Sequence, residues 1–245
     1  TLTNTGTIQS LDSGGTVAGY RAFAGSLANT GGLLDIDYNL SLNENSGQSL
    51  TYVGGTVDVA NGTTLTMTGA GTADFTGGTL NLNTSGTLTG PIANLSLPTS
   101  YTNAATLHFS DGSRTVISGT GTLLNQGVIY LGADTVNMAI DNRATLGVGW
   151  SGTYLNGLVT NSSYFGIGGS GHQLNAGFVN QAGGTINLNA GGYDMSVAVS
   201  GNSTNAGLIK LDDTANGYWT TYTQSSGTLT NTGTIQSLDS GGTVA

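Results

Sequence analysis

The chain repeats itself on two length scales, and this repetition constrains its fold more than any other feature. The first stretch, "TLTNTGTIQSLDSGGTVA" at 1–18, returns unchanged at 228–245, which defines a long unit over 1–227. Within this unit a shorter motif recurs: an Asn- or Gly-containing turn followed by an apolar–x–apolar triplet. The first apolar residues of the triplets are Ile8, Leu34, Val57, Leu80, Leu107, Ile129, Leu146, Phe165, Ile186, Ile209 and Ile235. A period of this length is typical of solenoids.

The triplets alternate with period two, so they predict strands with one buried and one exposed face. The expected inward pairs include Leu34/Ile36, Val57/Val59, Leu80/Leu82, Leu107/Phe109, Ile129/Leu131, Ile186/Leu188 and Ile209/Leu211. The expected outward residues between them are Asp35, Asp58, Asn81, His108, Tyr130, Asn187 and Lys210. Segments such as "LTMTG", "GTLTG" and "MSVAVS" supply candidate strands for the other walls. The extra residue in "TIQSL" predicts a bulge between Ile8 and Leu11.

The spacing of neighbouring triplets fits one coil of a parallel β-helix. The shortest interval runs from Ile129 to Leu146 and the longest from Leu80 to Leu107. We expect a right-handed helix, because coil lengths vary too much for a left-handed hexapeptide helix and parallel crossovers are right-handed. A β-sandwich is the alternative, but it would not give in-phase copies of one strand motif. Residues 1–227 then form one unit of ten coils, a whole number, and 228–245 begin the next identical unit of a single continuous solenoid.

Composition excludes several partners. Only 7% of residues are charged and the formal net charge is −9, which argues against nucleic acid or an anionic membrane as a ligand. The four basic residues are scattered, at Arg21, Arg114, Arg143 and Lys210. The chain has no cysteine and no apolar run long enough to insert into a membrane. Absent cysteine fits an exported bacterial protein without proving export.

The recurring "TNTGTI", "NQGVI", "TNAGLI" and "GGTINLNAGG" resemble the passenger and stalk segments of filamentous-haemagglutinin-type adhesins and autotransporters. The resemblance extends over essentially the whole chain. It implies a long right-handed β-helix, an extracellular location on the bacterial cell surface, and a structural or adhesive role. The secretion domain and N-terminal cap that such proteins carry are not part of this sequence.

Motifs for catalysis are missing: the sequence has no phosphate-binding loop, no H-E-x-x-H and no G-x-S-x-G. His108 is expected at an outward strand position and His172 in a loop, without a catalytic or metal role for either. Polysaccharide lyases and hydrolases also use β-helices, but Arg114 and Arg143 read as solvated corner residues. We therefore expect a protein that is not an enzyme and has no cofactor.

Calcium is the one metal that merits a hypothesis. The calcium β-roll signature is absent, but stacking would align carboxylates over consecutive coils at the junction between units, and aligned carboxylates can recruit Ca²⁺. The residues concerned are Asp12, Asp37, Asp212 and Asp239. The favoured alternative is that these side chains splay into water, because an oxygen cage needs more ligands than the sequence offers.

The longest intervals predict excursions from the walls, since surplus residues leave a solenoid as loops. The interval from Leu80 to Leu107 contains Pro91 and Pro98, which mark such a loop because proline cannot join a central ladder. Two further long intervals flank the junction and carry aromatic residues that form a candidate contact patch for a glycan or a second fibre. That patch comprises Tyr218, Trp219, Tyr222, Tyr20, Arg21 and Phe23. The alternative is that these aromatic rings fold over the wall or enter the core. Trp150 lies outside the patch and is expected to pack against the solenoid.

We expect the repeating shaft of a giant extracellular fibre or adhesin stalk, joined end to end to further copies of itself and able to bundle laterally. The alternatives are a glycan-binding module that uses the junctional aromatic loops, a self-assembling filament of short subunits, and, least favoured, a polysaccharide-degrading enzyme.

Overall fold

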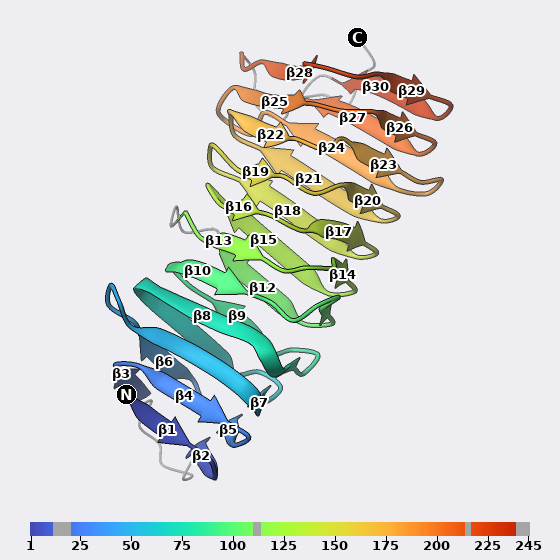
Figure 1. The fold of residues 1–245 in the computed structure, drawn as a ribbon. Helices are drawn as coiled ribbons and strands as arrows, with labels where there is room; N and C mark the ends of the chain where they lie inside the picture. Colours follow the sequence, from blue (N-terminus) through green and yellow to red (C-terminus); the bar gives the residue numbers. More distant parts are fainter. Residues whose placement is uncertain (12–20, 110–113, 214–216, 239–245) are drawn as a thin grey trace.

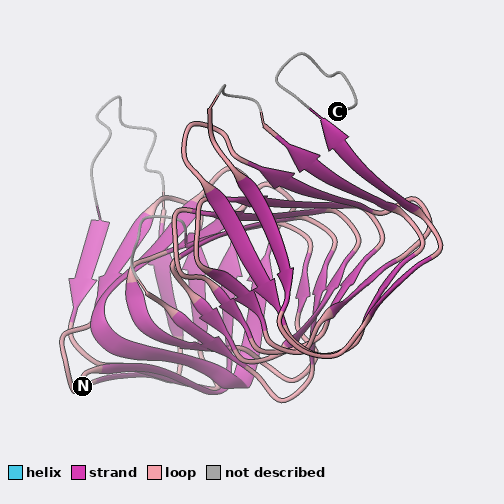
Figure 2. Cartoon of the chain, turned by 90° about the horizontal axis from the view of Figure 1, so that it is seen from above, coloured by secondary structure: helices cyan, strands magenta, loops and turns pink. Residues whose placement is uncertain are grey.

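The structure, a computed structural model, describes residues 1–11, 21–109, 114–213 and 217–238. All regular secondary structure in these residues is β, and every strand pairing is parallel. The strands stack along one axis as a β-solenoid of about ten turns (Figure 1), which confirms the predicted fold class. Seen along the axis, the strands run around one shared interior (Figure 2).

Each turn passes three walls in a fixed order, and we call them walls 1, 2 and 3. In wall 1 each strand is hydrogen-bonded to the equivalent strand of the next turn, without a break from β1 to β28. Its strands are β1 (Leu2–Asn4), β4 (Leu27–Thr30), the start of β7 (Ser49–Val59), the middle of β8 (Thr64–Leu82), β10 (Ile92–Ser96), β13 (Val116–Ser118), β16 (Thr135–Val136), β19 (Tyr154–Leu155), β22 (His172–Leu174), β25 (Met195–Val199) and β28 (Thr220–Gln224).

Wall 3 is equally continuous, from β3 to β30. Its strands are β3 (Arg21–Ala24), β6 (Leu40–Asn43), the start of β8, β9 (Thr87–Thr89), β12 (Thr106–Phe109), β15 (Val128–Gly132), β18 (Thr145–Gly149), β21 (Tyr164–Gly168), β24 (Thr185–Asn189), β27 (Leu208–Asp212) and β30 (Thr234–Leu238).

Wall 2 lies between walls 1 and 3 in the chain and consists of two blocks. The first block is β2 (Thr7–Ser10), β5 (Leu33–Ile36) and the ends of β7 and β8. The second block is a separate seven-stranded sheet of β11 (Thr102–Asn103), β14 (Thr122–Asn125), β17 (Ala139–Asn142), β20 (Val159–Asn161), β23 (Phe178–Asn180), β26 (Ser203–Asn205) and β29 (Leu229–Asn231).

The eleven triplets do not share one wall, as the sequence analysis assumed. Leu34, Val57 and Leu80 follow one another on wall 2, whereas Leu107 pairs with Leu88 on wall 3. The interval from Leu80 to Leu107 therefore contains an additional wall rather than an excursion. Pro91 and Pro98 flank β10, which pairs with both neighbouring strands of wall 1, so the predicted loop is wrong. Both prolines lie just outside the ladder, where a missing N–H costs little.

The duplicated stretch lies on different walls in its two copies. β1 and β2 occupy walls 1 and 2, but their sequence copies β29 and β30 occupy walls 2 and 3. One unit, the stretch 1–227, thus advances ten turns and one further wall. The expectation of a whole number of coils is wrong, and the cause is the additional wall between Leu80 and Leu107.

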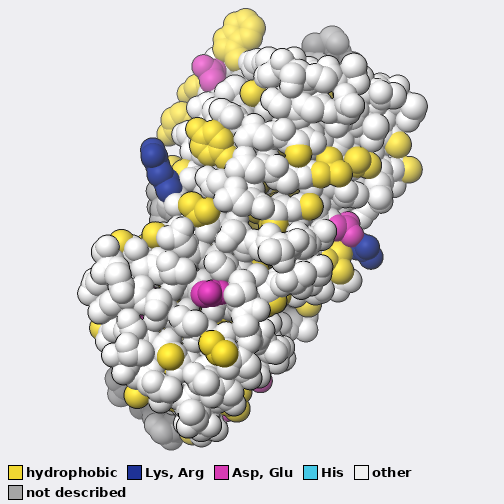
Figure 3. All heavy atoms as spheres, viewed as in Figure 1, with side chains coloured by type: hydrophobic (Ala, Val, Ile, Leu, Met, Phe, Trp, Pro, Cys, Tyr) yellow, Lys and Arg dark blue, Asp and Glu magenta, His cyan; other side chains and the backbone are white. Residues whose placement is uncertain are grey.

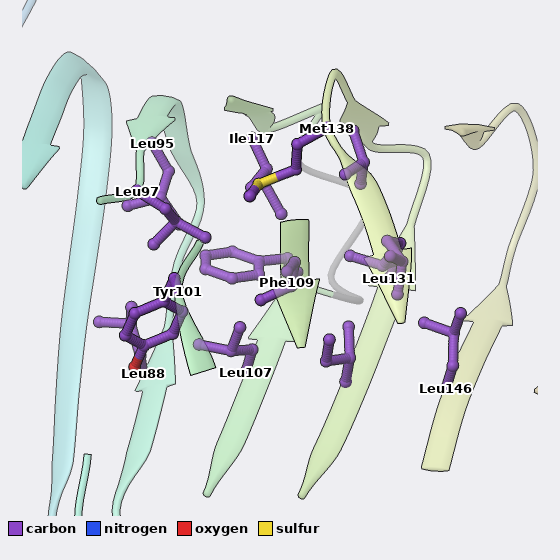
Figure 4. Close-up of a cluster of buried hydrophobic side chains, with 14 of the residues drawn as sticks. Leu88, Leu95, Leu97, Tyr101, Leu107, Phe109, Ile117, Leu131, Met138 and Leu146 are labelled. Carbon is purple, nitrogen blue, oxygen red and sulfur yellow. The ribbon is translucent and has the colours of Figure 1, made fainter. Parts of the chain in front are cut away.

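One hydrophobic core runs through the solenoid, and Figure 4 shows part of it between Leu88 and Leu146. The predicted inward pairs are confirmed: Leu34, Ile36, Val57 and Val59 are all at most 1% exposed. The predicted outward positions are confirmed as well, since Asp35, Asp58 and Lys210 are half-buried on the outer face. "LTMTG", "GTLTG" and "MSVAVS" form parts of the walls as expected.

No bulge separates Ile8 from Leu11, because β2 pairs with β5 in unbroken register. Ser10 takes the inward position and its hydroxyl donates to the Tyr38 carbonyl oxygen at 2.8 Å, while Leu11 is 46% exposed. A buried hydroxyl with a partner therefore replaces the expected apolar residue.

Asparagines, all but the last of them buried, connect successive coils at the turn that precedes most triplets. In the C-terminal coils the side chains form one column, in which each Nδ2 donates to the Oδ1 of the next at 2.7–2.9 Å. The column consists of Asn103, Asn125, Asn142, Asn161, Asn180, Asn205 and Asn231. Asn4 and Asn29 make the same contact at the corner between walls 1 and 2.

Candidate functional site

The structure does not bring the six predicted contact residues together. Tyr218 and Trp219 lie beside β28 at the C-terminal end and are 41% and 76% exposed. Tyr222 packs against the core there, as Phe23 does at the N-terminal end. Tyr20 lies outside the described residues.

Arg21 is engaged with its own end of the solenoid. Its guanidinium lies 4.0 Å from the centre of the Tyr38 ring, and Nη2 donates to the Leu11 carbonyl oxygen at 2.6 Å. Within one chain, Arg21 and Phe23 are therefore separated from Tyr218 and Trp219 by the length of the solenoid (Figure 1).

The predicted calcium ligands are only partly described. Asp12 and Asp239 lie outside the described residues. Asp37 is exposed after β5, and Asp212 ends β27 near the other end, where its carboxylate lies 3.5 Å from Lys210 Nζ. Among the described residues no three His, Asp or Glu side chains are grouped as metal ligands would be. Calcium at the junction stays a prediction.

A groove of about 1090 Å³ lies on the outer face of wall 3. It crosses five consecutive strands, from β12 to β24, which lie side by side in Figure 1. The central outward row along these strands reads His108, Tyr130, Gly147, Gly166 and Asn187. We call this hollow the wall-3 groove.

Glycines make the groove possible because they leave bare backbone on the outer face. The Tyr130 ring lies across Gly147, where an added Cβ would come within 2.6 Å of the ring. The Tyr164 ring lies across Gly166 in the same way, at 2.9 Å. An added Cβ on Gly149 would meet nothing within 4 Å, so the groove is open above this residue.

Aromatic rings border the floor. Tyr130 and Tyr164 are 44% and 42% exposed, Trp150 is 68% exposed and Tyr193 is 79% exposed. Trp150 is held outward by a left-handed backbone with φ of 60°, a conformation that costs a non-glycine residue about 1 kcal/mol or more. The expectation that Trp150 packs is wrong, because this turn directs its ring to solvent.

Polar groups complete the groove without contributing a net charge. Asn187 Nδ2 donates to the Tyr164 hydroxyl at 3.3 Å, and Asn187 Oδ1 has no hydrogen-bond partner among the described residues. The His108 and Tyr130 rings meet edge to face at 5.7 Å. No Asp, Glu, Lys or Arg belongs to the described lining. Charged side chains are also sparse on the face drawn in Figure 3.

The groove was not expected, although the sequence contains a signal for it. Tyr130 and Asn187 were assigned outward, and the same alternation puts Gly147 and Gly166 outward between them. Two glycines in consecutive outward positions, between Tyr130 and Asn187, would have predicted a hollow rather than a smooth wall.

His172 is buried in β22 and not in a loop, contrary to expectation, and it is 1% exposed. Nδ1 accepts from the Thr153 N–H at 3.3 Å and Nε2 lies 2.8 Å from the Gly168 carbonyl oxygen. Because that oxygen only accepts, Nε2 carries the proton and the ring is neutral. Burial lowers the pKa of His172, against the smaller opposing effect of its backbone hydrogen bonds.

Glu44 is another buried ionisable residue, and it is 1% exposed. Its two carboxyl oxygens and the Tyr52 hydroxyl have no hydrogen-bond partner among the described residues. Burial raises the pKa of the Glu44 carboxyl to about 7. Burial, and secondarily the charge of Glu44, raises the pKa of Tyr52 well above its ordinary value.

Comparisons with protein-family models, curated proteins and solved structures give no match for this chain. The described residues contain no helix long and apolar enough to cross a membrane. The class defined at this point is a parallel β-solenoid with an aromatic groove on one wall.

Proposed function

We propose that this chain is a segment of a stiff rod, the repeating shaft of a giant extracellular fibre or adhesin stalk on a bacterial cell surface. One observation carries the proposal. Asn231 is the copy of Asn4, and it accepts from Asn205 Nδ2 at 2.7 Å as Asn29 accepts from Asn4 at 2.8 Å. The duplicated stretch thus stacks as the next coil of the same solenoid, so a further copy would extend the same bonding pattern.

The bonding along the axis supports a mechanical role. Every coil is joined to the next by parallel backbone hydrogen bonds on its walls and, in most coils, by a buried amide pair. Bending the rod would have to open several of these contacts at once, and repeats of this kind gain stability from each neighbouring interface. The expected partners are further copies end to end, with lateral bundling as a secondary contact.

In such an array the additional wall brings the junctional aromatics together. The wall that follows β30 is wall 1, so the next copy of β3 would stack on β28. The copy of Phe23 would then lie in the core beside Tyr222, which leaves Tyr218 and Trp219 exposed for contact with a glycan or a second fibre. A glycan-binding junction is the second candidate, and the exposure of these two rings is what favours it.

Chains of one, two and three units test the rod directly. We expect particle length in electron micrographs to rise by roughly 50 Å per unit, from ten and a third coils spaced about 4.8 Å apart. Beads joined by flexible segments, or lengths that do not scale with unit number, would refute the proposal. A denaturing gel of native material separates a giant chain from a filament assembled from short subunits.

A further inference from the structure

We propose that the wall-3 groove is a binding site for a neutral, extended polysaccharide strand. The site is distinct from the junctional patch and does not depend on the rod function. It combines exposed aromatic rings, a backbone floor without side chains, and polar groups without charge.

The rings provide the contact surface. Tyr and Trp present a flat apolar face and a polar edge, and the faces of sugar rings, which expose C–H groups, stack on such surfaces. Tyr130 and Tyr164 lie on one side of the open floor at Gly149 and Trp150 follows directly after it. Four exposed aromatic residues around one hollow exceed the scattered apolar exposure of an ordinary surface.

The backbone of the Trp150 turn is built to hold that ring outward. An added Cβ on Gly169 would come within 1.5 Å of the Trp150 carbonyl oxygen, so only glycine fits beneath this turn. A large apolar side chain kept in solvent by a left-handed backbone gains nothing for folding, and strain of this kind concentrates at functional positions.

The polar groups select the ligand class. Tyr130 and Tyr164 line the groove and are 44% and 42% exposed, and a phenolic hydroxyl can both donate to and accept from ligand hydroxyls. The described lining has no ion to pair with a carboxylate, sulfate or phosphate, and the chain carries a formal net charge of −9, which repels anions. An uncharged ligand rich in hydroxyl groups is therefore the complementary one.

The dimensions fit a strand rather than a single sugar. The groove spans five strands of wall 3, so its length along the axis is four strand spacings, roughly 19 Å. One spacing is close to the length of one hexopyranose in an extended β-1,4-linked chain, so about four sugars lie over the groove with one per coil. A solenoid wall thus offers a contact that repeats in step with the polymer.

Binding of cellohexaose, mannohexaose and chitohexaose is measured by calorimetry, and by fluorescence in a Trp219→Phe chain, where Trp150 is the sole tryptophan. We expect saturable binding of at least one hexasaccharide and a change in Trp150 emission. Two variants remove the site: Trp150→Gly, which suits the left-handed backbone, and Gly149→Leu, which fills the open floor. Each should weaken binding about ten-fold or more, which is about 1.4 kcal/mol.

The matched control is Tyr154→Ala, which removes a 38% exposed aromatic side chain of wall 1 outside the groove and should bind as the parent does. Trp219→Ala tests the junctional patch separately. Melting curves establish that Trp150→Gly and Gly149→Leu remain folded; if Gly149→Leu is unfolded, Gly149→Ser serves in its place. The proposal is overturned if no neutral hexasaccharide binds, if heparin, polygalacturonate or a proline-rich peptide binds instead, or if Trp219→Ala abolishes binding and Trp150→Gly does not. Length measurements on multi-unit chains are unaffected by any of these outcomes.

Discussion

At the scale of single residues, His172 and Glu44 set opposite pH limits on stability. Burial favours the neutral form of each side chain, but one is a base and the other an acid. The unfolded chain binds a proton on histidine more readily than the folded chain does, and it releases the carboxyl proton more readily. The folded state is therefore disfavoured at both ends of the range between about pH 4 and pH 8.

His172 predicts a loss of stability in acid. Its folded pKa lies below the ordinary value, so its contribution is complete well above pH 6.5 and declines as the pH falls through and below that value. Urea unfolding at pH 5 and pH 8 should show that the unfolding free energy rises less, or falls more, with pH in His172→Gln than in the parent, because the opposing effect of Glu44 remains. An identical pH dependence in the two chains would show that His172 is not buried neutral.

Glu44 has the opposite effect on the pH dependence of stability. Its folded pKa of about 7 lies above the ordinary 4.5, so stability falls as the pH rises from 4.5 and levels off above 7. We expect Glu44→Gln to raise the unfolding free energy by about 2 kcal/mol at pH 8, allowing for partial screening by water, and by little at pH 4. Asp37→Asn removes an exposed carboxylate and serves as the control, and an equal gain from it would attribute the effect to net charge alone.

The burial of Glu44 and Tyr52 could not be predicted from the sequence. Glu44 stands in "NENSGQ", which reads as an exposed turn, and Tyr52 pairs with Asn29, at the position where other coils carry asparagine. The Tyr52 and Phe75 rings stack at 4.6 Å in that corner and interrupt the asparagine contacts. Their burial follows from the register of neighbouring coils, which residue types alone do not specify.

At the scale of the strands and turns, the asparagine column is the main polar support. Asn142 donates to Asn161 Oδ1 at 2.7 Å and to the Tyr164 carbonyl oxygen at 2.8 Å, and it accepts from Asn125 at 2.7 Å. All three asparagine side chains are fully buried. Removing one amide therefore leaves buried partners unsatisfied, a cost that exceeds that of the bond itself.

We predict that Asn142→Ala lowers the unfolding free energy by about 3 kcal/mol. Asn156→Ala is the matched control, because Asn156 makes the same amide contacts with Asn137 and Asn175, at 2.7 and 2.6 Å, on the exposed surface. There we expect less than about 1 kcal/mol. If urea titrations showed equal losses of unfolding free energy in both variants, burial would not be the reason why the asparagine column stabilises the fold.

The alternation of each triplet could be derived from the sequence, and so could the faces of Leu34, Val57 and His108, because period-two patterning is local. The wall of each triplet could not. The long interval from Leu80 to Leu107 fits either one coil with a loop or one coil with an additional wall, and its two prolines favoured the loop. The parallel pairing of Leu107 with Leu88 decides for the additional wall.

Engineered cysteines test this register, since the chain has none of its own. Thr89 and His108 are direct outward partners on adjacent strands, within the range of Cα separations that a disulfide spans. We predict that Thr89→Cys with His108→Cys loses its free thiols on mild oxidation. Asn81→Cys with His108→Cys should keep both free thiols. If this second pair were oxidised instead, the triplets of Leu80 and Leu107 would lie on the same wall, contrary to the structure.

At the scale of the whole molecule, the one-wall offset decides how repeated units would present their surfaces. The pattern that lies on wall 3 in one unit would move to wall 1 and then to wall 2 in the next two units. A groove on wall 3 would then appear on three sides of a rod in succession, and the same side would return every third unit. A fibre built this way would present its grooves on all three sides.

Cryo-electron microscopy of a chain of three or more units tests the central claim, that the duplicated stretch continues one solenoid on the next wall. We predict one uninterrupted β-ladder in which each unit is related to the previous one by a rise of roughly 50 Å and a displacement of its pattern by one wall. Units stacked in identical orientation, or a break in the ladder at the duplicated stretch, would contradict it.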